Sequence, residues 1–216
     1  MKTTKKDRTT VQAPRRKGRP KTFDRDEALG QALQVFYENG YEATSVAQLG
    51  EAMNMKPPSL YNAFGDKEGL FIEVLEHYHR PYQESVSEIF AGTESSRVAI
   101  GRLMEKSRHL HAGTNPIGCL VVNSTVNVGM EDSPIARKIK SLHDITEQLV
   151  FQKLKDGQEH GEIPQSVNVT KLARYVCGIL LGAAALARGQ KSPAAVEDLL
   201  DQGYQGFLGL AGLAAA

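Results

Sequence analysis

Apolar residues recur every three to four positions along most of this chain, a spacing that predicts amphipathic α-helices. The first stripe runs over 28–36, with Asp24 as an N-terminal cap and Asn39-Gly40 as the stop. Thr44 can cap a second helix. Pro57-Pro58 can open a third, because a proline in the first turn of a helix loses no hydrogen bond. These three helices are predicted to form one compact unit.

The helical pattern continues through the rest of the chain. Asp66 is predicted to cap a fourth helix, Ser133-Pro134 to open a long one, and Asn168 and Ser192-Pro193 to begin the last two. No alternating strand pattern with hairpin turns is present in the sequence. The predicted fold class is therefore all-α, with an N-terminal three-helix unit followed by a larger helical domain.

Charge is distributed unevenly, although the net charge is only +1. Residues 1–21 carry nine basic side chains and one acidic, which leaves 17 basic and 24 acidic side chains for the remaining residues. Residues 1–22 lack hydrophobic periodicity, and we expect this arm to be disordered away from DNA. An acidic body with a basic arm is typical of a protein that meets a polyanion at one end. A tail that only aids solubility is the alternative.

Few other residues suggest chemistry. The two cysteines are far apart and show no C-x-x-C spacing, so we predict no metal site or disulfide and expect a cytoplasmic protein. No glycine-rich phosphate loop, H-E-x-x-H or nucleophile elbow is present, which argues against an enzyme and against a cofactor. No apolar secretory segment follows the arm. The most apolar run, 177–187, is shorter than the roughly 20 residues of a membrane helix, so no membrane partner is expected.

Three groups of short motifs follow one another between residues 16 and 80. They are Gly18-Arg19-Pro20, Phe36…Gly40-Tyr41…Thr44-Ser45, and Ser59-Leu60-Tyr61…Phe64…Asp66-Lys67-Glu68…Leu70-Phe71. This region resembles the N-terminal domain of the TetR family of transcriptional regulators, although Pro57-Pro58 and Ala63 depart from the usual pattern. The resemblance implies a basic arm over 1–22, a helix-turn-helix DNA-binding domain over 23–70, and a helical effector-binding and dimerisation domain over 71–216.

The resemblance and the residue types together indicate the DNA contacts. We expect Lys56, Ser59 and Asn62 to face base edges or phosphates in the major groove. Tyr61 and Lys67 match family positions that clamp phosphates, and the start of the second helix is expected to do the same. Lys17 and Arg19 of the basic arm are expected in the minor groove. The full set of expected DNA contacts is Lys17, Arg19, Thr44, Ser45, Lys56, Ser59, Tyr61, Asn62 and Lys67.

A homodimer formed by the last two helices is also implied by the resemblance. Small residues there allow helices to approach closely, and two helices from each subunit would form a four-helix interface. A core within one subunit is the alternative. The candidate interface residues are Gly178, Gly182, Leu200, Tyr204 and Phe207.

Three residues are candidates for sensing an effector. Cys119 begins a predicted helix, where the helix dipole would lower the pKa of the thiol and favour a reactive thiolate; a small buried apolar role is the alternative. Asn123 and Asn127 lie four apart among apolar residues, and would either bind an effector or cap a neighbouring turn. Cys177 is predicted to be structural.

The sequence thus predicts a sequence-specific DNA-binding regulator. We expect a repressor that leaves a palindromic operator when a small-molecule effector binds or when Cys119 is modified. One alternative is a helical enzyme or ligand carrier with an incidental basic tail. Another is a non-specific DNA-binding protein, which would bind with salt-sensitive affinity but without operator preference.

Overall fold

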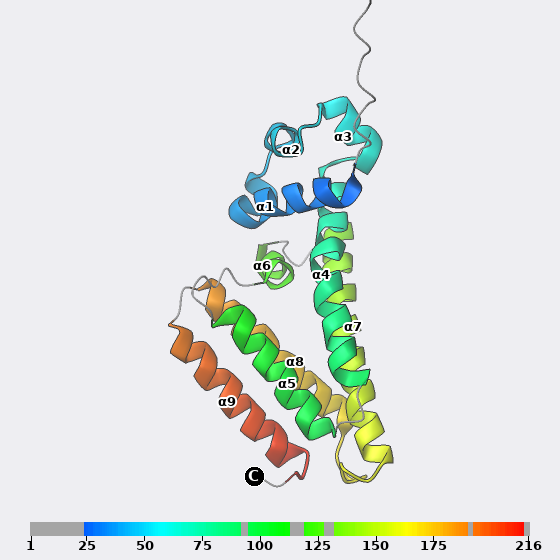
Figure 1. Cartoon of the computed structure of the whole chain (residues 1–216), viewed down its shortest axis with the longest axis vertical. Helices are drawn as coiled ribbons and strands as arrows, with labels where there is room; N and C mark the ends of the chain where they lie inside the picture. The colour runs from blue at the N-terminus through cyan, green and yellow to red at the C-terminus, as the bar shows by residue number, and fades with distance from the viewer. Residues whose placement is uncertain (1–23, 92–94, 113–118, 128–131, 190–191, 214–216) are drawn as a thin grey trace, which may run out of the picture.

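The computed structural model describes residues 24–91, 95–112, 119–127, 132–189 and 192–213, and the regular secondary structure in these ranges is α-helical. The predicted all-α fold is confirmed. Figure 1 shows α1, α2 and α3 gathered at one end of an elongated molecule, with α4 and α7 running side by side toward the other end. The helices are α1 (Arg25–Ala43), α2 (Val46–Ala52), α3 (Pro57–Phe64), α4 (Lys67–Ala91), α5 (Ser96–His111), α6 (Leu120–Asn127), α7 (Pro134–Glu159), α8 (Val169–Arg188) and α9 (Pro193–Leu210).

Local sequence signals set most helix starts. The side chains of Asp24, Ser133 and Asn168 accept hydrogen bonds from backbone N–H groups in the first turns of α1, α7 and α8. Asp66 accepts from the N–H of Gly69 at 2.7 Å before α4. These four caps are confirmed. The predicted stop at Gly40 is also real, because its φ of 77° leaves the helical region before the last residues of α1.

The cap of α2 lies one residue later than predicted. Ser45 accepts from the N–H of Gln48 at 3.2 Å, and the side chain of Gln48 accepts from the N–H of Ser45 at 2.8 Å, which completes a capping box. Thr44 is buried, and its hydroxyl donates to the carbonyl of Gly40 at 2.6 Å. Thr44 therefore closes the end of α1 instead of opening α2.

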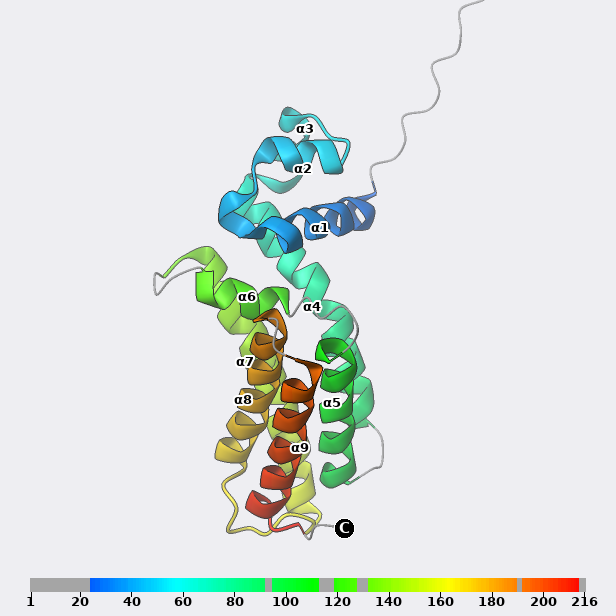
Figure 2. The ribbon, with the colours of Figure 1, turned by 90° about the vertical axis from the view of Figure 1, so that its left-hand side faces the viewer.

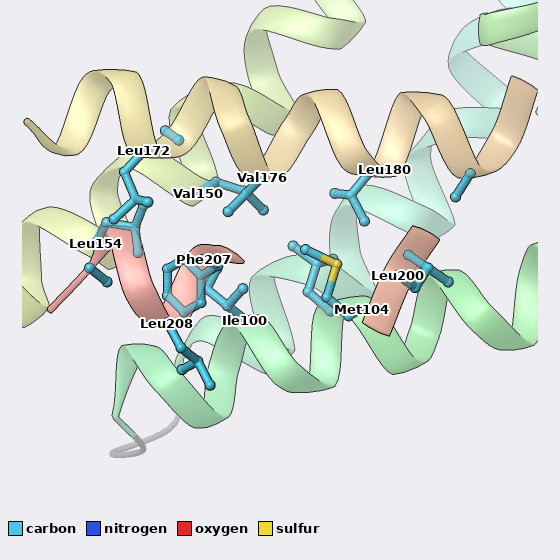
Figure 3. Close-up of a cluster of buried hydrophobic side chains, with 14 of the residues drawn as sticks. Ile100, Met104, Val150, Leu154, Leu172, Val176, Leu180, Leu200, Phe207 and Leu208 are labelled. Atoms are coloured by element: carbon cyan, nitrogen blue, oxygen red, sulfur yellow. The ribbon is translucent and has the colours of Figure 1, made fainter. Parts of the chain in front are cut away.

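A large apolar core fills the end of the molecule away from α1. Side chains from α5, α7, α8 and α9 meet there, and Figure 3 shows them pointing toward one another from the surrounding helices. The labelled members of this cluster are Ile100, Met104, Val150, Leu154, Leu172, Val176, Leu180, Leu200, Phe207 and Leu208.

A second apolar core joins the N-terminal helices to α6 and α7. It holds Phe36, Leu60 and Phe71 together with Leu120 and Val121 of α6, and all five are less than 4% exposed. Figures 1 and 2 show α6 lying between α1 and the helices of the larger bundle. The domain boundary expected at residue 70 falls inside α4, and the division into domains stays a prediction.

The α8 helix corrects one expectation. It has 20 residues and is the one helix within the described ranges that is long and apolar enough, by length and composition alone, to cross a membrane. The apolar run over 177–187 therefore underestimated the length of the apolar helix, which extends from Val169 to Arg188. In the fold, α8 buries Leu172, Val176 and Leu180 against its neighbours, and core helices of soluble bundles have the same composition.

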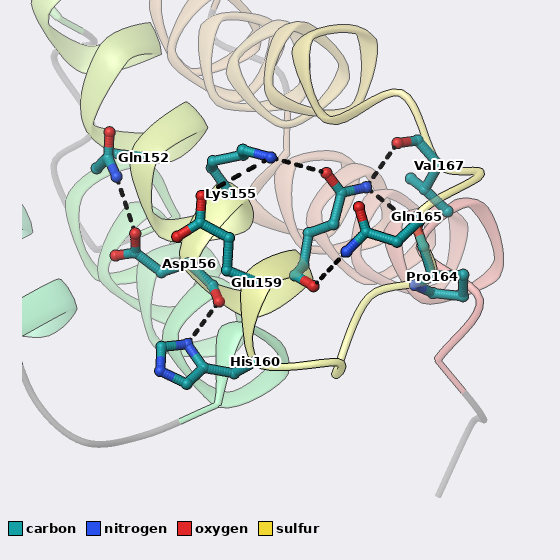
Figure 4. A network of polar contacts seen from close by, with 9 residues as sticks. Gln152, Lys155, Asp156, Glu159, His160, Pro164, Gln165 and Val167 are labelled. Carbon is teal, nitrogen blue, oxygen red and sulfur yellow. Dashed lines mark hydrogen bonds and ion pairs between the residues drawn. The ribbon is translucent and has the colours of Figure 1, made fainter.

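A polar network fixes the turn between α7 and α8 (Figure 4). The buried side chain of Gln158 donates to the carbonyls of Pro164 and Val167 at 3.1 and 3.0 Å, and Gln165 donates back to the carbonyl of Gln158 at 2.8 Å. In this connection the backbone carbonyls cannot be paired by helical hydrogen bonds, and the two glutamine side chains supply the donors instead. The turn consequently holds Glu162 in a defined place.

Glu162 caps the start of α5 from this turn. Its carboxylate accepts from the N–H groups of Ser96 at 2.6 Å and Arg97 at 3.0 Å. Partial burial raises the pKa of Glu162, but the hydrogen bonds from Arg97 and Ser96 outweigh it, so the net pKa lies below the ordinary value. Because the folded pKa is lowered, the stabilisation is present above the pKa of the unfolded state and is lost as pH falls through the folded pKa.

Glu162→Gln is expected to lower the free energy of unfolding by about 1 kcal/mol at pH 7, because a neutral amide stabilises the helix N-terminus less. Urea denaturation from pH 7 to about 3.5 should show the difference from the parent shrinking below pH of about 4. Glu159→Gln is the control, since this exposed residue only pairs with Lys155 at 3.8 Å. Equal effects of the two variants at pH 7 would contradict the capping role.

Candidate functional site

The short helix α3 presents the predicted DNA-reading side chains to solvent. Ser59 and Asn62 are exposed on it, as is Lys56 at its N-cap, and Tyr61 is 48% exposed. The apolar residues of the same helix, Leu60 among them, are buried in the second core. One face of α3 is therefore open to solvent and could enter a DNA groove, while the other face packs into the core.

Arg25 of α1 holds the C-terminal end of α3. Its guanidinium donates to the carbonyl of Ala63 at 3.1 Å, pairs with Glu73 of α4 at 2.6 Å, and lies 4.5 Å from the ring centroid of Phe64. One side chain thus joins α1, α3 and α4. Sequence reasoning missed Arg25, because its partners are 38 and 48 residues away and follow no local spacing.

Lys67 fixes the corner between α1 and α2. Its ammonium donates to the carbonyls of Tyr41 at 3.0 Å and Thr44 at 3.1 Å, and lies 4.3 Å from the centroid of the Tyr41 ring. The sequence assigned Lys67 to a phosphate. The structure gives it an intramolecular role in orienting the helices that carry the DNA contacts, and a direct phosphate contact stays a prediction.

The remaining expected DNA contacts have different outcomes. Ser45 is exposed at the start of α2, where a phosphate contact stays a prediction. Thr44 is only 2% exposed with its hydroxyl bonded to Gly40, so its side chain has no surface to offer DNA, and that expectation is wrong. Lys17 and Arg19 lie outside the described residues.

A cavity of about 340 Å³ lies among α4, α5, α6, α7 and α8. This volume lies in the lower part of the range usual for small-molecule pockets. Its walls are mainly apolar, and they include both described cysteines and three histidines. The lining residues are Tyr78, His79, Pro81, Tyr82, Lys106, Ser107, Leu110, His111, Cys119, Val121, Val122, His143, Thr146, Glu147, Cys177, Leu180, Leu181 and Ala184.

The three histidines of the cavity favour the neutral form. Burial lowers the pKa of His79, His111 and His143, because water no longer stabilises the imidazolium. The charged residues of the wall are Lys106 and Glu147, and Glu147 pairs with Arg174 at 3.1 Å. Among the described residues, no group of three or more His, Cys, Asp or Glu side chains is placed to hold a metal ion.

Cys119 lies in the cavity wall just before the first residue of α6, as expected, but its thiol is not activated there. Burial raises the pKa of Cys119, and hydrogen bonds from Val122, Tyr78 and Val121 offset this only in part. The expected lowering by the helix dipole is therefore wrong, because desolvation outweighs it. Burial also raises the pKa of Cys177 to about 12.

Asn123, the candidate whose side chain is described, does not line this cavity. Asn123 lines a smaller hollow between α1 and α6 that also includes Tyr37 and Arg188. The side chain of Asn127 lies outside the described residues. An effector contact by Asn123 stays a prediction. In the structure, Asn123 lies beside α1 and does not reach the larger cavity.

The candidate dimer residues mostly point into their own subunit. Leu200 and Phe207 are 0% exposed, and the hydroxyl of Tyr204 donates to the carbonyl of Arg97 at 3.1 Å. A Cβ atom on Gly182 would lie 3.2 Å from the Leu199 side chain of α9. Gly178 is exposed with open space around it. The intramolecular alternative is therefore correct for Leu200 and Phe207, whose hydrophobic spacing marks the core.

Comparison with known proteins identifies both halves of the chain. Residues 28–74 match the family model described as bacterial regulatory proteins, tetR family. Residues 97–202 match the model described as the tetracyclin repressor-like C-terminal domain. The first match covers the helices that hold α3, and the second covers most of the cavity wall.

Individual relatives agree with these matches. The HTH-type transcriptional repressor ComR of Escherichia coli (strain K12) is 37% identical over 174 residues, which are 80% of this chain and 83% of ComR. The repressor BdcR of the same strain is 44% identical over 61 residues, or 28% of this chain and 31% of BdcR. A solved cysteine mutant of the TetR family regulator CifR, complexed with 26-base-pair double-strand operator DNA, has a TM-score of 0.76 at 29% identity and covers 87% of this chain and 98% of that one.

Lys67→Met is expected to lower the free energy of unfolding by about 2 kcal/mol, because two backbone carbonyls lose a charged donor. Lys56→Met is the matched control, since Lys56 is exposed, and its change should stay within about 0.5 kcal/mol. Urea denaturation at pH 7 measures both values. A Lys67 variant as stable as the control would show that the ammonium does not support the corner.

Proposed function

We propose that this chain, which belongs to the TetR family and is a DNA-binding transcriptional regulator, acts as a homodimeric repressor that a small molecule releases from a palindromic operator. The observation that carries the proposal is the pairing of an exposed reading face on α3 with an apolar cavity built from helices that reach the same core. Binding of an effector there has a direct mechanical route to α3.

The proposed DNA contacts come from α3 and the start of α2. Ser59, Tyr61 and Asn62 are exposed on α3, Lys56 is exposed at its N-cap, and Ser45 is exposed at the N-cap of α2. A helix presented in this way fits the major groove, with amide and hydroxyl groups available to base edges and phosphates. The solved CifR complex with operator DNA supports the same use of this domain.

The proposed release depends on α4 and α6. The cavity is lined by Tyr78 and Tyr82 of α4 and by Val121 of α6. The same helix α4 begins at Lys67, which bonds the end of α1 among the DNA-binding helices. A ligand that fits the cavity better in a conformation with displaced α4 or α6 would shift the population toward that conformation. Operator affinity would fall by the same free-energy difference.

The proposed dimer uses the outward faces of α8 and α9. Gly178 and Leu181 of α8 are exposed, the latter 38%, and Leu210 of α9 is 57% exposed. Small and apolar residues on one face suit close packing between helices of two subunits. A two-fold dimer then matches a palindromic site, because each subunit reads one half.

Other modes of action have less support. Modification of Cys119 would require its thiol to ionise first, and desolvation raises the pKa of that thiol. The curated relatives are named as transcriptional regulators, so we propose no catalytic activity and no membrane partner, and we place the action on DNA in the cytoplasm. The small-molecule route through the cavity is the one we adopt.

Selection of bound sites from random double-stranded DNA with the purified full chain tests the proposal. We expect one inverted repeat, bound by two subunits, whose measured affinity exceeds that of scrambled DNA by at least about 10³-fold. Enrichment of no sequence would leave only salt-dependent binding and would support the non-specific alternative. A recovered site without two-fold symmetry would contradict the homodimeric mode of reading.

Lys56→Ala should weaken binding to all DNA sequences and reduce the slope of log affinity against log salt by about one, because one phosphate neutralisation is lost. Lys171→Ala is the control, since this exposed lysine lies in the first turn of α8, far from α3. Fluorescence anisotropy with the selected site at several salt concentrations measures both. An unchanged slope for Lys56→Ala would remove it from the interface.

A further inference from the structure

We propose that the cavity binds a small, mainly apolar molecule that carries one hydroxyl group, such as a phenol or an alcohol, and that His79, Ser107 and His111 hold this hydroxyl. The ligand class concerns the cavity itself. Its regulatory consequence rests on the function proposed above.

Three side chains of the cavity wall each carry a buried polar atom without a hydrogen-bond partner. These atoms are Nε2 of His79, Oγ of Ser107 and Nδ1 of His111, the only such side-chain atoms found within the described residues. The three side chains are 7%, 3% and 9% exposed, and each lines the cavity. Buried polar atoms in folded proteins are nearly always paired, so three unpaired ones around one cavity indicate a missing polar partner.

The three groups come from two packed helices. Ser107 and His111 are four residues apart on α5, which places them on one face, one above the other. His79 belongs to α4, which contacts α5 directly. Because all three line the same cavity and their two helices are in contact, we infer that a single small group reaches more than one of them.

The hydrogen-bonding character of these groups selects a hydroxyl. A backbone hydrogen bond with Leu142 engages the ring of His79, and because Nε2 is unpartnered, that bond uses Nδ1. In the neutral ring, Nε2 is then an acceptor and requires a donor from the ligand. Ser107 can donate to the ligand in return. A hydroxyl is the smallest group that donates and accepts at once.

Ionic head groups fit the cavity less well. A carboxylate has no hydrogen to give and would face the lone pair of His79 at Nε2, while the cation of the wall, Lys106, lies over the Tyr82 ring at 5.8 Å from its centroid. An ammonium ion would need a carboxylate, but Glu147 already pairs with Arg174. The rest of the wall consists largely of apolar and aromatic side chains, among them Tyr78 and Leu180, which suit a ring or a short alkyl chain.

Calorimetric titration of the full chain without DNA tests the ligand class. The probes are 4-propylphenol, its methyl ether 4-propylanisole, propylbenzene and 4-propylbenzoate. We expect the phenol to bind at least about tenfold more tightly than each of the other three, because only it pairs the buried acceptor. Equal or tighter binding of the ether, the hydrocarbon or the benzoate overturns the proposal, as does failure of the phenol to bind.

Variants locate the hydroxyl. Ser107→Ala and His79→Phe should each reduce the preference for the phenol over propylbenzene by about fivefold or more while propylbenzene still binds. Ser141→Ala is the control, because Ser141 bonds the carbonyl of Lys138 on α7 and does not line the cavity. If His79→Phe does not fold, Ser107→Ala decides alone. A preference unchanged in Ser107→Ala places the hydroxyl elsewhere and overturns the assignment.

Operator binding is measured separately, so the two proposals can fail independently. If the phenol binds as expected but leaves operator affinity unchanged, the ligand class stands and the release mechanism fails. If the protein binds its operator but no phenol, the ligand class fails and the regulator remains.

Discussion

The apolar core that α4, α6 and α7 share with α1, α2 and α3 is the interaction on which the rest of the structure depends. A helix of eight residues is too short to be stable alone in water, so α3 takes its conformation from packing. Leu60 and Phe64 bind it to the core, while Arg25 and Lys67 fix its end and the neighbouring corner. The reading face is therefore oriented by residues that do not themselves face the groove.

The same core lies directly against the cavity. Val121 is 1% exposed, belongs to the core of the DNA-binding helices and also lines the cavity. Tyr78 and Cys119 pack against this core and line the cavity as well. These three residues therefore connect the cavity wall to the packing that orients α3. Because close-packed interiors transmit small displacements, no long chain of intermediates is required between the two sites.

Sequence reasoning succeeded where the signal is local and failed where it is not. Asp24, Asp66, Asn168 and Pro57-Pro58 predicted helix starts correctly, because caps and φ restrictions act within one turn. The roles of Arg25 and Lys67 depend on partners more than twenty residues away. Burial of Cys119 reverses the effect expected from its place at a helix start, and burial appears in no local motif. The exposed face of α3 could be predicted, because the spacing of its apolar residues Leu60 and Phe64 indicates which face is buried.

The polar side chains of the cavity wall give it a means to distinguish ligands. Leaving a buried polar atom unpaired costs roughly 1–3 kcal/mol, so a ligand that pairs His79, Ser107 and His111 is favoured over one of the same shape that does not. An all-apolar wall would not distinguish ligands by their head groups. A ligand that pairs these atoms stabilises the bound protein by mass action. The lining helices α4, α6 and α7 also reach the core of the DNA-binding helices, so a conformation that a ligand stabilises would also set the position of α3.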